Sequence, residues 1–337
     1  MSGDIALIIG NGFSISFNKH HKFEQYSDTQ NPTKWPLYFG SESEKLIESF
    51  PRLKQFLSKH ADKQDFLAFE KAAEIYTNFD RNAEHYRVIE TQDGYTGELT
   101  EAFEKDIIPI ECRHFLSIAF SNYSIDAKAA LDKEWPWYKW IEENRSRISA
   151  VCSYNYDLLI ELVLEKLNRS YYNEAMDFKF GAIPLYKPHG SCDYETTGIE
   201  IEGLHYPVSS YFDNNDFKIK RLTFKNILSV RIVPYCVIPN QRNIYSHFIP
   251  MIRQEEKFNR QISEVDYCLI IGHSYADVDK PEIDASLAKL KKGAKVIVAN
   301  PTPSDELLHK IAELGLESIS WENYLGPLDS EGRLIKI

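Results

Sequence analysis

The chain opens on an unbroken apolar run followed by a glycine turn, Ile5-Ala6-Leu7-Ile8-Ile9-Gly10-Asn11-Gly12. A strand whose side chains are apolar on both faces is typical of the interior of a parallel sheet. In an α/β protein, the turn directly after such a strand lies at the carboxyl edge of the sheet, where ligands bind. This stretch therefore predicts a strand buried on both faces of the parallel sheet of a Rossmann-like fold.

Short apolar runs recur along the rest of the chain, and several are followed by residues with helical periodicity. The predicted strands cover residues 148–153, 183–186, 266–272, 295–299 and 316–320. Strands that alternate with helices are typical of a doubly wound sheet. The sequence thus predicts an α/β protein with a Rossmann-like doubly wound parallel sheet.

The stretch between the first strand and residue 148 has few strand-like runs. Its helical patterns cover 44–60, 66–76 and 100–121. We therefore predict a helical insertion over 21–147, and a Rossmann-like domain formed by 1–20 and 148–337. A further helix is predicted over 240–264, leading into the strand that follows it.

Composition narrows the functional classes. The 337 residues carry a formal net charge of -11, which argues against a broad nucleic-acid surface, because phosphate binding depends on clustered Lys and Arg. The five cysteines form no Cys-x-x-Cys pair, so a zinc ribbon is not expected. With no secretory leader and no long apolar run, the odd cysteine count indicates a cytoplasmic protein that does not enter a membrane. We interpret the sequons at Asn122 and Asn168 as accidental.

Two motifs near the first strands combine small and polar residues. In Gly10-Asn11-Gly12-Phe13-Ser14 the glycines would let the backbone approach a pyrophosphate, and a plain turn is the alternative. Ser153-Tyr154-Asn155-Tyr156-Asp157 follows the second strand, where its polar side chains would face the binding crevice. The alternative is that Asn155 or Ser153 caps the next helix.

Three further motifs follow later strands. His189 stands between Pro188 and Gly190 in a loop after a strand, which favours a catalytic role over a structural one. Gly272-His273-Ser274 suits a phosphate or ribose contact, whereas the nearby Asp277 and Asp279 could equally cap the helix that begins near Lys280. A buried strand ends at Asn300, whose amide could bind a ribose hydroxyl.

All five motifs close predicted strands at the same sheet edge, and together they resemble the sirtuin-like domains of bacterial anti-phage defence proteins. The resemblance rests on Gly-Asn-Gly-Phe-Ser at Gly10, Tyr-Asn-Tyr-Asp at Tyr154, Pro-His-Gly-Ser at Pro188, Gly-His-Ser at Gly272 and Asn-Pro at Asn300. It covers both ends of the chain but not its helical middle. The paired zinc-binding cysteines of true sirtuin deacylases are missing here, which weakens a deacylase interpretation.

The resemblance implies a Rossmann-like domain that hydrolyses NAD+ to ADP-ribose and nicotinamide. It implies that Asn155 holds the nicotinamide ribose or the water, that His189 is the base, and that Asp157 holds the nicotinamide amide. The cofactor-binding residues that it implies are Gly10, Asn11, Gly12, Phe13, Ser14, Asp157, Gly272, His273, Ser274 and Asn300.

Two alternatives remain open. The same pocket could serve an NAD-dependent transferase, either a deacylase or an ADP-ribosyltransferase, or a non-catalytic sensor of NAD+ or ADP-ribose. Because an unregulated NAD+ hydrolase would kill its host, we expect activation through a partner protein or homo-oligomerisation, with 42–147 as the contact surface. Such an enzyme would deplete NAD+ in antiviral defence by abortive infection.

Other conspicuous residues receive no catalytic role. The aromatic segment Trp135-Pro136-Trp137-Tyr138-Lys139-Trp140 is expected in the core. Glu70 is expected on a solvated helix face. His20, His21 and the scattered histidines show no ligand spacing on one helix face, so we expect no metal.

Overall fold

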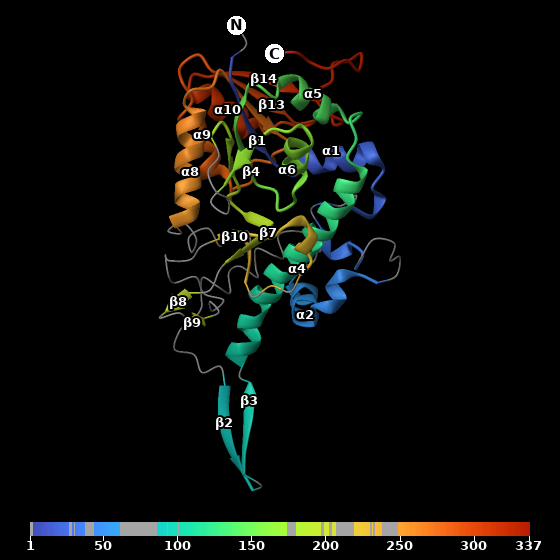
Figure 1. The fold of residues 1–337 in the computed structure, drawn as a ribbon, viewed down its shortest axis with the longest axis vertical. Coiled ribbons are helices and arrows are strands. Elements are labelled where there is room, and N and C mark those ends of the chain that lie inside the picture. The colour runs from blue at the N-terminus through green and yellow to red at the C-terminus, as the bar shows by residue number, and fades with distance from the viewer. Residues whose placement is uncertain are drawn as a thin grey trace.

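The computed structural model describes residues 3–26, 29, 31–37, 44–60, 86–92, 94–99, 101–173, 180–196, 199–201, 204–206, 219–229, 231, 233–237 and 249–337. Figure 1 shows a Rossmann-like body that carries both termini at one end, and a long helix, α4 (Glu101–Ala130), that runs away from it. The predicted helix over 66–76, with Glu70, lies outside the described residues.

The central sheet has seven strands in the order β14-β13-β12-β1-β4-β6-β5, and every pair is parallel. Its members are β1 (Ile5–Ile9), β4 (Ile148–Ser153), β5 (Tyr171–Tyr172), β6 (Ile183–Tyr186), β12 (Tyr267–Ile271), β13 (Lys295–Ala299) and β14 (Glu317–Trp321). The predicted α/β fold is confirmed. The chain leaves β1 toward β4 on one side and returns on the other side at β12, so β1 stands at the topological switch point.

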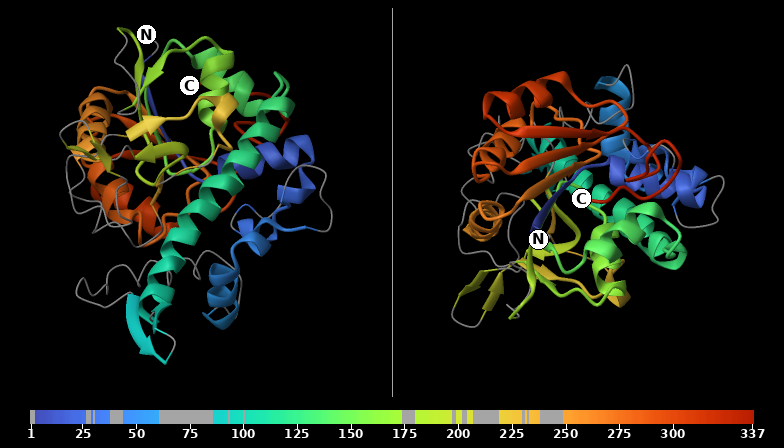
Figure 2. Two further views of the ribbon diagram at one scale, coloured as in Figure 1. Left: turned by 60° about the horizontal axis from the view of Figure 1, so that its bottom comes forward. Right: turned by 90° about the horizontal axis from the view of Figure 1, so that it is seen from above.

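Helices cover both faces of this sheet (Figure 2). One face carries α1 (Gly12–His21), α5 (Pro136–Asn144) and α6 (Leu159–Lys166), and the other carries α8 (Ile249–Ile262), α9 (Lys280–Leu287) and α10 (Asp305–Glu313). Successive side chains of a strand point to opposite faces. Accordingly Leu7 and Ile9 pack with the first group, whereas Ala6 and Ile8 pack with the second. Both halves of the apolar run are therefore buried, as the sequence indicates.

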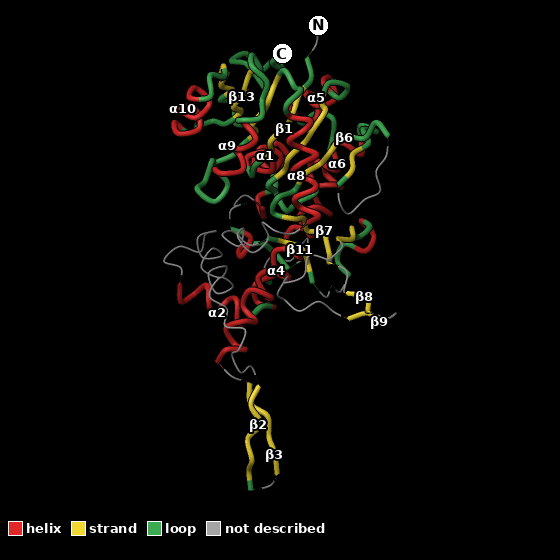
Figure 3. The backbone as a smooth tube through the Cα atoms, turned by 90° about the vertical axis from the view of Figure 1, so that its left-hand side faces the viewer, coloured by secondary structure: helices red, strands yellow, loops and turns green. Residues whose placement is uncertain are grey.

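Besides its helices, the insertion contains a two-stranded hairpin that was not predicted. It contains α2 (Pro51–His60), α4, and a hairpin of β2 (Tyr86–Thr91) and β3 (Gly94–Leu99) that extends beyond the end of α4 (Figure 3). The helix predicted from residue 44 begins only at Pro51, because a proline is favoured in the first turn but interrupts a helix interior. A short 3₁₀ turn, Leu46–Ser49, precedes it.

A second sheet lies between β6 and β12 in the chain and was not predicted. Its strands β10 (Ile219–Arg221), β7 (Gly190–Thr196) and β11 (Pro234–Cys236) pair antiparallel, and a small hairpin of β8 (Ile199–Ile201) and β9 (Leu204–Tyr206) follows β7. Strands β7 and β11 pack against α4 beyond the carboxyl edge of the main sheet. The division into 1–20 with 148–337 and 21–147 stays a prediction.

Several buried groups complete the core. Trp135 and Trp140 of the aromatic segment are fully buried, and all five cysteines are buried and free. Burial raises the pKa of Cys268 to about 12, so its thiol stays protonated at neutral pH. Within the described ranges, no helix has both the length and the apolar character needed to cross a bilayer.

Candidate functional site

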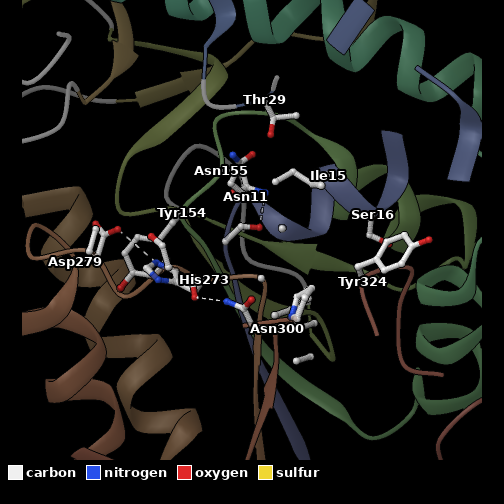
Figure 4. A pocket seen from close by; sticks show the side chains of 18 of the residues that line it. Asn11, Ile15, Ser16, Thr29, Tyr154, Asn155, His273, Asp279, Asn300 and Tyr324 are labelled. Atoms are coloured by element: carbon white, nitrogen blue, oxygen red, sulfur yellow. Dashed lines mark hydrogen bonds and ion pairs between the residues drawn. The ribbon is translucent and has the colours of Figure 1, made fainter. Parts of the chain in front are cut away.

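A pocket of about 910 Å³ opens at the carboxyl edge of the main sheet (Figure 4). Its walls come from the segments that follow β1, β4, β6, β12, β13 and β14. Of the predicted catalytic and cofactor-binding residues, those that line it are Gly10, Asn11, Gly12, Asn155, Asp157, His189, Gly272, His273, Ser274 and Asn300. Residues that are distant in sequence, Asn155 and His189 among them, thus meet around one cavity.

The glycine turn closes the floor of the pocket by packing on the loop after β12. A Cβ atom at Gly12 would lie 2.4 Å from the Cα atom of Gly272, and one at Gly10 would lie 2.8 Å from the carbonyl oxygen of Gly272. The Gly12 N–H donates to that same oxygen at 2.8 Å. The glycines are therefore needed for contact between two loops. The turn also places the amino terminus of α1, a favourable site for an anion, against the pocket.

Phe13 and Ser14 are not among the described residues that line the pocket, and their contact with a ligand stays a prediction. Phe13 is fully buried, with its ring centroid 4.7 Å from that of Trp135. Ser14 donates to Asp157 Oδ2 at 2.7 Å and accepts from Asn155 Nδ2 at 3.2 Å. Helical periodicity explains this placement. The face of α1 toward the pocket carries Ile15, Ser16 and Lys19, whereas Phe13 and Ser14 are buried away from it.

Asn155 is held by its amide nitrogen. Besides its bond to Ser14, Nδ2 donates to the carbonyl oxygen of Gly10 at 3.1 Å, and the side chain is buried. This hydrogen-bond network assigns the amide orientation, so Oδ1 is the atom that a ligand would meet. Asp157, and not Asn155, bonds the start of α6, since its Oδ1 accepts from the Leu159 N–H at 3.0 Å. Burial raises the pKa of Asp157 despite the nearby Lys187.

A buried ion pair between Lys187 and Glu161 stabilises the segment that carries Asn155 and Asp157. The fully buried Lys187 donates from Nζ to the carbonyl oxygen of Asp157 at 2.6 Å and to Glu161 Oε1 at 2.9 Å. Burial alone would lower the pKa of Lys187, but the carboxylates of Glu161, Asp193 and Asp157 outweigh it and raise that pKa. Lys187 is therefore a charged anchor for the segment that carries Asn155. The local sequence around Lys187 does not indicate this role.

The position of His189 is set by the adjacent Gly190 and by contacts with Val237, Tyr154 and Tyr156. Gly190 has φ +74, and a Cβ there would lie 2.1 Å from the carbonyl oxygen of Tyr235, so only glycine fits. The His189 carbonyl accepts from the Val237 N–H at 2.8 Å. The centroid of its ring lies 5.3 Å from that of Tyr154 and 6.0 Å from that of Tyr156. The loop after β6 thus presents the imidazole to the pocket in one place.

Asp279 has partners that the sequence did not indicate. Its Oδ1 lies 3.0 Å from His189 Nε2, and its Oδ2 lies 3.4 Å from His273 Nε2. Although Asp279 occupies the position before α9, its side chain makes no capping hydrogen bond. Burial would raise the pKa of this carboxyl, but the charge and hydrogen bond of His189, with a smaller contribution from His273, hold that pKa well below its ordinary value.

The far end of the pocket is lined by the segments after β13 and β14. Asn300 Nδ2 donates to the carbonyl oxygen of His273 at 3.0 Å, and its Oδ1 accepts from the Thr302 N–H at 3.1 Å (Figure 4). Lys19 Nζ lies 4.4 Å from the ring centroid of Tyr324. Of the described residues that line the pocket, Lys19 is the only lysine or arginine. It was missed, although it lies on the same helix face as Gly12, Ile15 and Ser16.

One group of side chains has the composition of a metal site. His20, His21 and Asp132, named here the His-His-Asp cluster, bring their potential ligand atoms within 4.8 Å of one another. The imidazole nitrogens lie 3.8 and 3.9 Å from the Asp132 oxygens. Asp132 Oδ1 already accepts from the backbone of Glu134 and Trp135. Spacing along one helix does not reveal this cluster, because Asp132 comes from another segment than His20 and His21.

Comparisons with known proteins give structural similarities alone. No family model matches the sequence, and no curated protein does. Among solved structures, a Sir2 homologue in complex with NAD is 12% identical with a TM-score of 0.41, covering 96% of this chain and 86% of that one. Sir2Tm bound to a propionylated peptide is 10% identical with a TM-score of 0.41, covering 95% and 88%. The strand order and the parallel register, rather than these similarities, define the fold.

Proposed function

We propose that this protein is an NAD+ hydrolase that cleaves NAD+ to ADP-ribose and nicotinamide. The observation that carries the proposal is that Asn155 and His189 line one pocket at the switch point of a Rossmann-like sheet. The five motifs that resemble sirtuin-like defence domains add to it. In the same proposal the enzyme acts in the cytoplasm as an effector of antiviral defence that depletes NAD+ when activated.

The pocket suits a dinucleotide in size and in the order of its polar groups. Its volume of about 910 Å³ lies near the upper end of the range for small-molecule sites, roughly 300–1,000 Å³. The amino terminus of α1 and the ammonium group of Lys19 offer positive charge to a pyrophosphate. In the proposed arrangement the adenosine half extends toward Asn300 and Tyr324, and the nicotinamide ribose lies toward Asn155 and His189.

The chemical step places its demand on the ribose. As the glycosidic bond breaks, its electron pair leaves with the ring nitrogen, so the pyridinium departs as neutral nicotinamide. The anomeric carbon gains positive character until a water oxygen bonds to it, and His189 accepts the proton that the water or a ribose hydroxyl releases. The net reaction consumes one NAD+ and one water and yields ADP-ribose, nicotinamide and one proton.

Asn155 contributes through its fixed dipole. Because Nδ2 is bonded to Gly10 and Ser14, Oδ1 presents the negative end of the amide dipole to the ligand. A prearranged dipole stabilises developing positive charge without reorganising during the reaction, and it can also accept a hydrogen bond from the attacking water.

The test is incubation of the full-length protein with NAD+ and measurement of nicotinamide and ADP-ribose. We expect Asn155→Ala and His189→Ala each to lower nicotinamide release about 10²–10⁴-fold. His309→Ala is the matched control, because His309 is an exposed histidine on α10. Turnover that persists unchanged in both pocket variants would contradict the proposal. Modified acceptor in place of free ADP-ribose would indicate a transferase, and calorimetric binding without turnover would indicate a sensor.

Regulation through a partner protein or through self-association belongs to the same proposal. The hairpin β2–β3 extends beyond α4, away from the sheet, and exposes Val88 by 61% and Ile89 by 36%. A two-stranded ribbon of this kind gains stability when a further surface covers it. We expect specific activity to rise with protein concentration or with added partner. Full activity in the dilute, isolated monomer would contradict this part.

A further inference from the structure

The carboxylate of Asp279 bridges two imidazoles at the wall of the pocket. Oδ1 lies 3.0 Å from His189 Nε2, within hydrogen-bond distance, and Oδ2 lies 3.4 Å from His273 Nε2. All three residues line the pocket. The side chains of Asp279 and His273 are 10% and 3% exposed, so this charge sits in a site from which water is largely excluded.

The backbone determines which nitrogen of His273 carries its proton. The Tyr275 N–H donates to His273 Nδ1 at 2.9 Å, so Nδ1 offers its lone pair and the proton belongs on Nε2, which faces Asp279. Tyr275 adopts the left-handed conformation, with φ 56, which is uncommon for a residue with a side chain. Its hydroxyl donates to Asp284 Oδ1 at 2.5 Å, which holds the residue in place. The backbone of the loop after β12 therefore fixes the orientation of the His273 ring.

Asp279 itself is committed to the pocket and not to its own helix. It directly precedes α9, where an aspartate commonly accepts a capping hydrogen bond, yet its side chain makes none. Asp277, two residues earlier in the same loop, behaves differently, because its exposed carboxylate pairs with Lys280 at 2.6 Å. The structure thus separates two acidic residues that the sequence treats alike.

We propose that Asp279 is the positioning residue that orients His189 as the base, and that His273 fixes Asp279 in turn; this inference rests on the proposed hydrolase function. With Nε2–H donating to Asp279 Oδ1, His189 is left with the lone pair of Nδ1 to accept the proton. When that proton arrives, the imidazolium lies beside a carboxylate and is stabilised by it. No proton needs to pass to Asp279.

The groups that face His189 come from two segments. The loop after β12 supplies Asp279 and His273, and the loop after β4 supplies Tyr154 and Tyr156. The ring of Tyr154 also lies against that of His273, at 4.8 Å between centroids. Among these described neighbours Asp279 is the only carboxylate, so its removal takes away the negative charge that lies 3.0 Å from His189 Nε2.

The test replaces the carboxylate by an amide of the same shape, Asp279→Asn, in the full-length protein. An amide can offer N–H to His189 Nε2 and so stabilise the wrong tautomer. We expect kcat for nicotinamide release to fall at least tenfold and up to about 10⁴-fold, the full value of a general base, with a smaller change in KM. The acid limb of the kcat–pH profile should move to lower pH, because the imidazolium loses its counter-charge. Asp277→Asn should leave both kcat and the profile unchanged.

A spectroscopic readout separates this inference from the proposed function. Nitrogen-15 NMR of the histidine side chains, with His189 assigned by comparison with His189→Gln, should show the proton of neutral His189 on Nε2 in the wild type and a mixture of tautomers in Asp279→Asn. If the wild type releases no nicotinamide, the hydrolase proposal fails, while the NMR result still decides whether Asp279 orients His189. Unchanged tautomer populations, or an unchanged kcat–pH profile in Asp279→Asn, would overturn the inference.

Discussion

Replacing the buried Lys187 by methionine tests whether the ion pair beneath the site supports the fold. Methionine fills a similar volume but lacks the ammonium group, which bonds the Asp157 carbonyl at 2.6 Å and Glu161 Oε1 at 2.9 Å. Hydrogen bonds to charged groups contribute about 1.5–3 kcal/mol each, so two of them amount to roughly 3–6 kcal/mol. Leaving one buried charge without its partner typically costs about 3–5 kcal/mol. We therefore expect Lys187→Met to lower the free energy of unfolding by about 3–5 kcal/mol.

The assay is equilibrium unfolding in urea, with the midpoint and the slope compared between variants. Lys139→Met is the matched control, because Lys139 pairs with Glu134 at 2.6 Å on the exposed surface and should contribute less than about 1 kcal/mol. Adding Glu161→Leu to Lys187→Met removes the unpaired carboxylate and should restore part of the lost stability.

Two outcomes would refute this reasoning. The first is a loss below about 1 kcal/mol for Lys187→Met, which would mean that water or another group replaces the ammonium. The second is that the two substitutions lower the free energy of unfolding additively, so that the double variant loses the sum of the two single losses. Additive losses would mean that the two side chains do not interact.

Three further predictions concern the glycine turn, the carboxylate of Asp279 and metal dependence. Gly12→Ala should cost about 1–3 kcal/mol or more and weaken NAD+ binding in calorimetry, because its Cβ would lie 2.4 Å from the Cα atom of Gly272; wild-type binding would contradict this. The pKa of Asp279 is depressed in the folded state, so its contribution to stability is present above about pH 3.8, the ordinary value, and is lost as the pH falls below it. The difference in unfolding free energy between wild type and Asp279→Asn should therefore shrink below that pH, and a difference that grows on acidification would contradict the assignment. Chelation with EDTA should leave nicotinamide release unchanged, because the His-His-Asp cluster lies outside the residues that line the pocket; a chelator-sensitive rate restored by added zinc would overturn the expectation of no metal.

The fold was accessible from the sequence because both faces of the main sheet are buried. A strand covered on two sides reads as an unbroken apolar run, and Ile5–Ile9 is such a run. The strands at 148–153, 183–186 and 295–299 were predicted with the boundaries that the structure shows. The hairpin β2–β3 was missed, although the dipeptide Asp93-Gly94 is a hairpin signal. Val88 and Ile89 of β2 are exposed and so do not face a core.

The residues that line the pocket were easier to predict than the contacts between their side chains. Polar residues at strand ends converge because parallel strands share one carboxyl edge. The placement of Asn155 and His189 in one pocket could therefore be predicted without knowing the paths of the loops. The contact of His189 with Asp279 spans 90 positions and follows no local periodicity. Phe13 and Ser14 do not line the pocket because, although they directly follow the glycine turn, they belong to α1 and are buried.

Stability and chemistry share residues at this site, which limits how the pocket can change. The segment that carries Asn155 is held on one side by Ser14 and the carbonyl of Gly10, and on the other by the charged Lys187 under Asp157. Loosening either contact should displace the side-chain carbonyl of Asn155 and lower the rate, since a displacement of about 1 Å can cost a hundredfold in rate. A variant of Lys187 should therefore lose turnover even at temperatures where it stays folded, although Lys187 does not line the pocket.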